Sequence, residues 1–423
     1  MWKQPWGYAE GWTISFGLFL TGVILQVTTG KVDATLFQYP LNAIVGGVFL
    51  FFLVMLYVVS RKAAALQWFY SLTASITSLT AWMVLVIIMG LTRQVAPSAT
   101  VTHGGLLSGL GFMQMTSSWP FLLLFLYFIS VLGLVTIHKI SRFRWKDIPF
   151  LLNHAGLFIT LLAAILGNGD LQRLRMTATL DNPEWRATDD AGRMTELPLA
   201  IELKSFTIDE YPPKLLAIDN TTGKALPEGN PENLLIEESP LSGSLLDWDI
   251  EVTRSLPMAA CVRTVDTMNF VAFHSEGATT ALLVKARNRV DGTEKSGWVS
   301  CGSFMFPYVS LPLSDSVSLV MPEPEPKRFA SEVTVYTQSG ERVDALIEVN
   351  KPLSMDGWKI YQLSYDEAKG KWSSTSIFEL VKDPWLPVVY LGILMILLGS
   401  VCLFVLAPGN RQSPKAANDT KTE

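Results

Sequence analysis

The 423-residue sequence predicts a polytopic α-helical membrane protein with six transmembrane helices and a large β-rich extracytoplasmic domain between helices 5 and 6. Two observations carry this prediction. Charged residues are missing from six long apolar segments, and they are concentrated in one acidic stretch between the fifth and sixth of these segments. A mean hydropathy of +0.31 and a hydrophobic content of 49% fit this mixture, because most soluble enzymes are less apolar and purely helical membrane proteins are more so.

Each apolar segment is long enough to cross a bilayer, which takes about 20 mainly apolar residues. None of the six contains Asp, Glu, Lys or Arg in its interior. The segments are Trp12–Thr28, Leu41–Ser60, Ser71–Leu91, Trp119–Ile137, Ile148–Leu166 and Trp385–Ala407. The predicted parts of the chain are an additional N-terminal transmembrane hairpin (1–70), a membrane core of three helices (71–167), the β-rich domain (168–384), a C-terminal transmembrane helix (385–407) and a cytoplasmic tail (408–423).

Basic residues lie in alternate loops and predict the orientation of the spans. Lys and Arg precede the first span and follow the second, fourth and sixth, whereas the opposite loops hold only Lys31 and Arg93. Positive residues favour the cytoplasmic side of a membrane. Both termini are therefore expected in the cytoplasm and the 168–384 domain outside, and we see no pattern typical of a cleaved signal peptide.

The 168–384 domain has 21 Lys and Arg against 33 Asp and Glu, a net charge of −12, while the rest of the chain carries +7. Along it, short runs of β-forming residues are separated by Gly, Pro, Asn and Asp, which is typical of strands and turns. Such runs are Leu199–Leu203, Ala281–Lys285, Val317–Met321, Glu332–Tyr336 and Trp358–Gln362. The overall charge of −5 argues against nucleic acid as the main partner.

Few residues of this domain indicate catalysis, and we predict no catalytic residue in it. It has no Gly-rich phosphate loop, no zinc-ligand spacing and no Gly-x-Ser-x-Gly motif. His274 is the domain's only histidine, so a catalytic Ser-His or Cys-His pair would depend on it, and a structural role is the alternative. Cys261 and Cys301 are compatible with a disulfide, with small core residues or with thiol chemistry.

His154 is the one titratable side chain well inside a predicted span, about 10 Å beyond Asp147 at 1.5 Å per residue. An ionisable residue in a membrane is by default a candidate functional site. The alternative is a neutral histidine hydrogen-bonded to a neighbouring helix, a role that Asn153 beside it would also suit. Gly156, two residues further on, permits close approach by another helix or a flat ligand.

A single imidazole in apolar surroundings is suited to serve as an axial ligand of haem iron. His154 is therefore the predicted cofactor-binding and metal-binding residue. Haem commonly takes two axial ligands, so the second is expected from a partner protein. The basic residues of 139–146 are positioned for haem propionates, although the positive-inside rule alone accounts for them. His103, in the loop before the fourth span, is a weaker candidate for touching haem.

Several motifs resemble the ResB (CcsB) family of system II cytochrome c biogenesis proteins. The resemblance covers roughly residues 71–407 and is most specific in the second half of the β-rich domain. Its residues are Ser118-Trp-Pro-Phe-Leu122, His154 followed by Gly167, Leu197–Phe206, Val349–Leu353, Gly357–Asp366 and Val381–Pro387.

The resemblance implies a function and a set of partners. A ResB-type subunit, with a tryptophan-rich CcsA-type membrane protein, would bind haem transiently and relay it across the bacterial inner membrane for covalent attachment to apocytochrome c. A thioredoxin-like thiol reductant is implied as well. His154 matches the family's membrane histidine, and the extra hairpin and an unfused C-terminus are departures from the usual family pattern.

Two other classes of function remain open on the sequence. One is a haem-independent membrane transporter, although such proteins usually carry intramembrane carboxylates or cations. The other is a membrane-anchored scaffold or sensor with an extracytoplasmic ligand-binding domain, although the short cytoplasmic loops hold no output domain.

Overall fold

A computed structural model of the chain describes residues 4–95, 105–237, 241–264 and 268–406. The chain divides into two compact units, a helical unit of residues 1–172 and 382–423 and a β unit of residues 173–381. The β unit lies within the predicted 168–384 domain. His103 and the predicted tail 408–423 lie outside the described residues.

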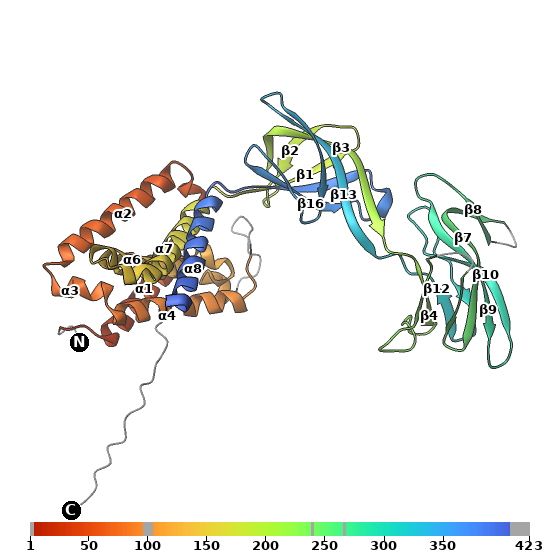
Figure 1. The fold of residues 1–423 in the computed structure, drawn as a ribbon, viewed down its shortest axis with the longest axis horizontal. Coiled ribbons are helices and arrows are strands. Elements are labelled where there is room, and N and C mark those ends of the chain that lie inside the picture. The colour runs from red at the N-terminus through yellow and green to blue at the C-terminus, as the bar shows by residue number, and fades with distance from the viewer. Residues whose placement is uncertain (1–3, 96–104, 238–240, 265–267, 407–423) are drawn as a thin grey trace, which may run out of the picture. The chain divides into compact units, whose positions relative to one another are not determined.

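Six long apolar helices form the helical unit, which confirms the predicted fold class (Figure 1). Their composition and length suffice to cross a membrane, so the chain is a membrane protein. They are α1 (Tyr8–Thr29), α2 (Leu41–Ser60), α4 (Leu72–Leu91), α6 (Trp119–Ser141), α7 (Ile148–Gly167) and α8 (Leu386–Leu406). Short helices lie between them: η1 (Ala34–Phe37), α3 (Ala64–Gln67), η2 (Trp68–Tyr70), α5 (Leu106–Gly109), η3 (Phe112–Ser117) and η4 (Trp145–Asp147).

Two helices extend beyond their predicted spans. The first begins at Tyr8 instead of Trp12, because Glu10 is accommodated in the first turn, where its carboxylate accepts a hydrogen bond from the Gly7 N–H at 2.9 Å. The fourth runs to Ser141 instead of Ile137, which brings His138 and Lys139 into its last turns. Cations are favourable at that end of a helix.

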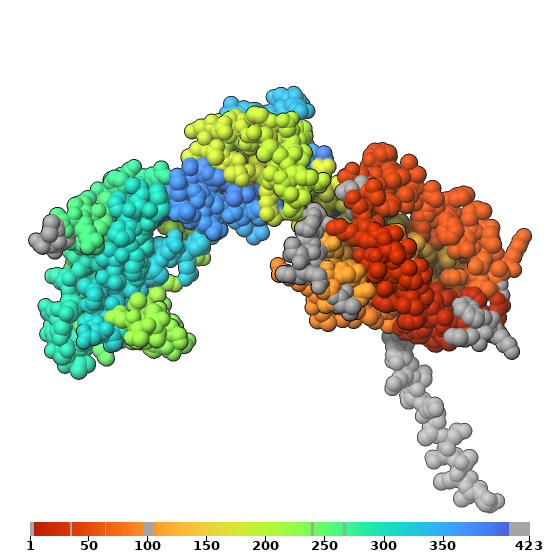
Figure 2. Space-filling view, turned by 180° about the vertical axis from the view of Figure 1, so that it is seen from behind, coloured from red at the N-terminus to blue at the C-terminus, as the bar shows by residue number. Residues whose placement is uncertain are grey.

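The helix α6 is the centre of the unit, since 67% of its apolar window is buried, against 28% or less in each of the other five spans. Apolar side chains on the outer helices are more than half exposed, as Phe16, Phe51 and Leu397 show, and this surface suits lipid. The helices α1 and α2 do not form a closely packed hairpin: each packs on α6, and α2 also contacts α7. Figure 2 shows both, in red to orange, at the surface of the unit.

The β unit is β-rich, as the sequence predicts, and its strands form three antiparallel sheets. The strands are β1 (Gln172–Thr179), β2 (Glu184–Thr188), β3 (Met194–Glu210), β4 (Lys214–Asp219), β5 (Asn233–Leu235), β6 (Leu241–Leu245), β7 (Trp248–Arg263), β8 (Met268–Ala272), β9 (Thr279–Asn288), β10 (Glu294–Ser300), β11 (Leu311–Pro312), β12 (Val317–Val320), β13 (Pro326–Thr337), β14 (Arg342–Glu348), β15 (Leu353–Met355), β16 (Trp358–Tyr365) and β17 (Thr375–Lys382). A single turn, η5 (Gly370–Trp372), precedes β17.

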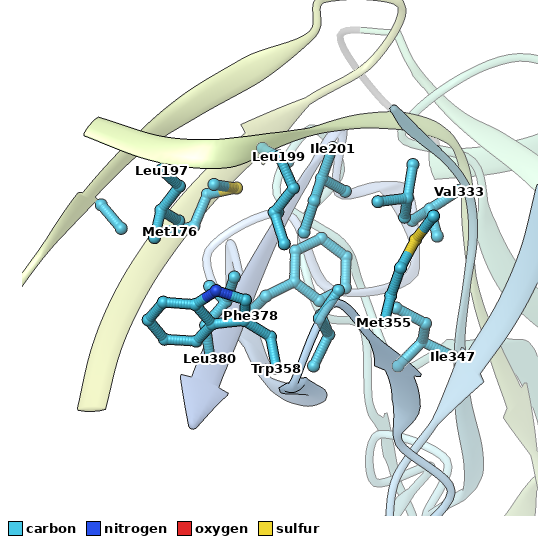
Figure 3. Close-up of a cluster of buried hydrophobic side chains, with 14 of the residues drawn as sticks. Met176, Leu197, Leu199, Ile201, Val333, Ile347, Met355, Trp358, Phe378 and Leu380 are labelled. Atoms are coloured by element: carbon cyan, nitrogen blue, oxygen red, sulfur yellow. The ribbon is translucent and has the colours of Figure 1, made fainter. Parts of the chain in front are cut away.

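The largest sheet has the order β14-β13-β3-β2-β1-β17-β16-β15. Side chains from both of its ends meet in one core, since Ile347 of β14 packs in the same cluster as Met355 of β15 and Trp358 of β16. Figure 3 shows Trp358 and Phe378 facing residues of β3 across this core. Burial of these apolar groups is the main stabilising contribution to this part of the fold.

Two smaller sheets share a second core. Their orders are β10-β9-β7-β6, with β8 paired to β7, and β11-β12-β4-β5. Leu215, Trp248 and Leu319 belong to the cluster that joins them. The β unit therefore has one hydrophobic core in the large sheet and another between the small sheets.

Candidate functional site

The segment before α7 places its first turns at the basic end of the helical unit. Asp147 is buried, and its Oδ1 lies 3.0 Å from the Lys139 ammonium at the end of α6. Pro149 lies in the first turn of α7. The N–H groups of a first turn have no partner within the helix, so the N–H that proline lacks costs no helical hydrogen bond. His154 follows about 10 Å along the axis from Asp147 at 1.5 Å per residue, as the sequence predicts.

The His154 ring is held by its own helix. Its Nδ1 lies 2.9 Å from the carbonyl oxygen of Phe150, one turn earlier, and the Phe150 ring stacks on it with centroids 3.7 Å apart. A carbonyl only accepts hydrogen bonds, so Nδ1 carries the proton of the neutral ring and Nε2 keeps its lone pair. The side chain is half-buried. Among the described residues, His154 makes no hydrogen bond to a neighbouring helix, which was the structural alternative.

Asn153 and Gly156, the neighbours named with His154, pack instead on α8. The Asn153 Oδ1 accepts a hydrogen bond from the Ser400 hydroxyl at 3.1 Å. A Cβ built on Gly156 would lie 2.7 Å from the carbonyl oxygen of Gly392, so the two backbones are in contact there. Gly156 therefore permits the close approach of a helix, α8. His154 lies on a different face of α7 from the one that Asn153 and Gly156 pack against α8.

A second histidine lies at the same end of the unit, near the end of α6. The ring of His138 stacks on Tyr70 with centroids 4.5 Å apart and 15° between the ring planes. The Tyr57 hydroxyl is 3.5 Å from His138 Nδ1 and 2.5 Å from the Ser141 hydroxyl. His138 is thus enclosed by aromatic residues, a packing that the sequence did not reveal because Tyr57 and Tyr70 are distant in the chain.

An acidic junction lies at the opposite end, where α7 leads to β1 and β17 leads to α8. The Asp170 carboxylate accepts three hydrogen bonds: from the Tyr39 N–H at 2.7 Å and from Asn42 Nδ2 and Trp385 Nε1 at 2.6 Å each. Burial raises the pKa of Asp170, but these three donors outweigh it and leave the pKa lowered. We call these four residues the Asp170 junction.

The Asp170 junction was not predicted, although the sequence offered one signal for it. Asp170 is the first acidic residue after the fifth span. Its donors come from α2, the segment before it and the start of α8, which are far apart in sequence. Gly167 completes the arrangement, because a Cβ there would lie 2.6 Å from the Trp385 side chain.

The candidate residues of the β unit do not converge. His274 is exposed in a loop after β8. Cys261 and Cys301 are both unpaired; Cys261 packs beside a small apolar cluster with Phe270, and the Cys301 sulfur lies 3.5 Å from the Thr279 hydroxyl. Within the described residues, no group of three or more His, Cys, Asp or Glu side chains is placed to hold a metal ion.

The motif residues Asp356, Gly357 and Gln362 have structural roles in the large sheet, and Asp383 has one at the start of α8. Asp356 and Gly357 form the tight turn between β15 and β16, both with positive φ, which Asp-Gly pairs favour. Gln362 is buried, and its Oε1 accepts a hydrogen bond from the Ser331 hydroxyl at 2.6 Å. Asp383 accepts hydrogen bonds from the Trp385 and Leu386 N–H groups and so caps the start of α8.

Comparison with known proteins supports the resemblance found in the sequence. No curated protein matches the chain. The model of the ResB-like family matches residues 275–377, a stretch that runs from the loop before β9 into β17 and includes the Gly357–Asp366 motif. The match lies within the β unit, where it supports the resemblance to ResB-like proteins and, in general terms, an involvement in cytochrome c biogenesis.

Proposed function

We propose that this chain binds haem in the membrane through His154 and relays it, with a CcsA-type partner, for attachment to apocytochrome c. The observation that carries the proposal is the hydrogen bond from His154 Nδ1 to the Phe150 carbonyl oxygen. It fixes the ring orientation and leaves Nε2 as a free donor of electrons to iron. Haem is the cargo in this account, and its iron would take Nε2 as one axial ligand.

The surroundings of His154 fit a macrocycle. Phe150 and the apolar residues of α7 provide an apolar surface of the kind that the haem macrocycle requires. The Lys139 ammonium lies 5.4 Å from the centroid of the Phe150 ring, and that ring stacks on His154. Arg142, Arg144 and Lys146 are exposed in the adjoining loop, where they suit the two propionates.

We infer a partner protein because the described residues place one candidate ligand, His154, in the membrane. His138 is enclosed by Tyr57 and Tyr70, and no second histidine contacts His154 among the described residues. A six-coordinate haem on the half-exposed face of His154 would therefore take its other ligand from a CcsA-type subunit. Reduction of the apocytochrome thiols falls to a thioredoxin-like protein, since Cys261 and Cys301 do not converge on a shared site.

The orientation follows from the positive-inside rule. Arg61, Lys62 and the basic loop 139–146 would lie in the cytoplasm of a bacterium, with both termini. The β unit, with its net negative charge, would lie in the periplasm. Haem would then enter near His154, close to the cytoplasmic face, and leave at the end where the Asp170 junction lies.

Absorption spectroscopy of the chain co-purified with its partner tests this function. The variant His154→Gln keeps a polar side chain of similar length but removes the imidazole, and His138→Gln is the matched control. We expect the haem Soret band to weaken or shift only in His154→Gln, with a parallel loss of c-type cytochromes in cells. Unchanged haem and unchanged cytochromes in His154→Gln would overturn the ligand assignment, and a haem-free complex of the wild type would overturn the function.

A further inference from the structure

A narrow apolar cavity opens between α2, α6 and α7 at the end of the helical unit where α7 leads to β1. Its volume is about 320 Å³, at the lower end of the range of about 300–1,000 Å³ for small-molecule sites. Phe49, Phe125, Ile129 and Leu162 line its deeper part. It does not include His154, which lies two turns further along α7.

The length of the cavity matches one leaflet of a bilayer. Along α6 it extends from Trp119 to Ile129, ten residues, or about 15 Å at 1.5 Å per residue. The apolar core of a bilayer is about 30 Å thick, so this is about the depth of one leaflet. Trp119 begins the apolar span, which places the mouth of the cavity at the level of the lipid carbonyls.

Polar groups line the cavity only at its mouth. Ser117 and Trp119 lie there, with Asn168 and Gly169 on the α7 side. The Ser117 hydroxyl and the Trp119 Nε1 are buried and have no hydrogen-bond partner among the described residues, and the Ser117 side chain is only 2% exposed. Each buried donor without a partner costs about 1–3 kcal/mol, so two together in one cavity wall indicate a missing acceptor.

The main chain around these donors is already satisfied. The Ser117 carbonyl accepts from the Val32 N–H at 2.9 Å, and the Trp119 N–H donates to Gln26 Oε1 at 3.1 Å. Among the described residues, the Ser117 hydroxyl and the Trp119 Nε1 remain without a hydrogen-bond partner. An apolar tube with two donors at one end fits an amphipathic molecule with an apolar tail and an acceptor oxygen at its head.

We propose that this cavity binds one acyl chain of a phospholipid from the leaflet on the β1 side, with the ester carbonyl at Ser117 and Trp119. The lipid fills the groove between α6 and the α2–α7 pair. It thereby stabilises the contact of the N-terminal segment with the core helices. The cavity does not include His154, so the proposal of a lipid site does not depend on haem binding.

Native mass spectrometry of the full-length protein tests the proposal. The protein is extracted in mild detergent, stripped of loosely bound lipid and titrated with palmitoyl-oleoyl phosphatidylglycerol. Leu126 lines the cavity and is half exposed, so Leu126→Trp fills the groove with a larger, mainly apolar side chain. Leu50 is similarly exposed on α2 but does not line the cavity, which makes Leu50→Trp the matched control.

We expect one tightly retained phospholipid in the wild type and in Leu50→Trp, with affinity about tenfold lower in Leu126→Trp, a change of about 1.4 kcal/mol. Trp119→Phe keeps the ring but removes the N–H, and it is expected to weaken retention without changing the fold. Equal retention in Leu126→Trp and Leu50→Trp would mean lipid bound only around the helices and would overturn the proposal. Retention of a quinone in place of phospholipid would overturn it as well.

Discussion

The hydrogen bonds of the Asp170 junction should stabilise this part of the helical unit by an amount that can be measured apart from the packing of the helices. In Asp170→Asn, one carboxylate oxygen is replaced by an NH₂ group that faces the donors of Tyr39, Asn42 or Trp385. Hydrogen bonds to a charged group are worth about 1.5–3 kcal/mol each, and the half-buried position of Asp170 favours the lower end. With one oxygen still able to accept, we expect a local loss of about 1–2 kcal/mol.

Amide hydrogen exchange measures this loss directly, because the Tyr39 N–H is itself one of the donors. A loss of 1–2 kcal/mol corresponds to exchange about 5–30-fold faster in the peptide that contains Tyr39 and Asn42. Asp181→Asn is the matched control, since its side chain is 80% exposed in a turn of the β unit. Equal protection of Tyr39 in wild type and Asp170→Asn would show that the junction contributes nothing and would refute this reasoning.

The junction also predicts a pH dependence. The pKa of Asp170 is lowered in the folded protein from its ordinary value of 3.8, so its contribution is complete above that value and is lost as the pH falls below it. We expect the unfolding temperatures of wild type and Asp170→Asn to converge as the pH is lowered below about 4. A difference that persists or widens at lower pH would contradict this sign.

Two further predictions concern packing in each unit. Gly156→Val would push α7 from the Gly392 carbonyl and is expected to destabilise the helical unit by about 1–3 kcal/mol in a reversible detergent-unfolding titration, whereas Gly17→Ala, with open space around it, should be neutral or better. Gln362→Ala would leave the buried Ser331 hydroxyl with one partner fewer and should cost about 1–3 kcal/mol, measured by protease susceptibility of residues 173–381 in urea. No change in either assay would contradict the packing described.

The fold class was predictable because its signals are local. An apolar segment without charges is recognisable within its own 20 residues, and the alternation along Trp358–Gln362 reports a half-buried strand directly. The ends of the spans were less predictable, since Glu10 belongs to the first turn of α1, where its carboxylate accepts a hydrogen bond from the Gly7 N–H. The helices α1 and α2 each pack on α6 and not closely on each other. This arrangement depends on tertiary contacts that no local sequence pattern encodes.

The candidate site was predictable only in part for the same reason. His154 stands out because no other His, Asp, Glu, Lys or Arg lies deep in a predicted span, but its partner could have been another helix. That Phe150 supplies the carbonyl is a property of the rotamer, and the sequence does not specify it. The donors of Asp170 are 128 to 215 residues away, and the cavity at Ser117 is formed by three helices, so neither could be located before the chain was folded.

Pulsed electron paramagnetic resonance tests the central claim, that His154 ligates haem, most directly. This chain, labelled with ¹⁵N-histidine, is combined with haem and an unlabelled CcsA-type partner, and hyperfine coupling between the ferric iron and ¹⁵N is recorded. We predict a directly coordinated ¹⁵N in the wild type and in His138→Gln, and its loss in His154→Gln. The same ¹⁵N coupling in His154→Gln, or none in the wild type with haem bound, would contradict the account.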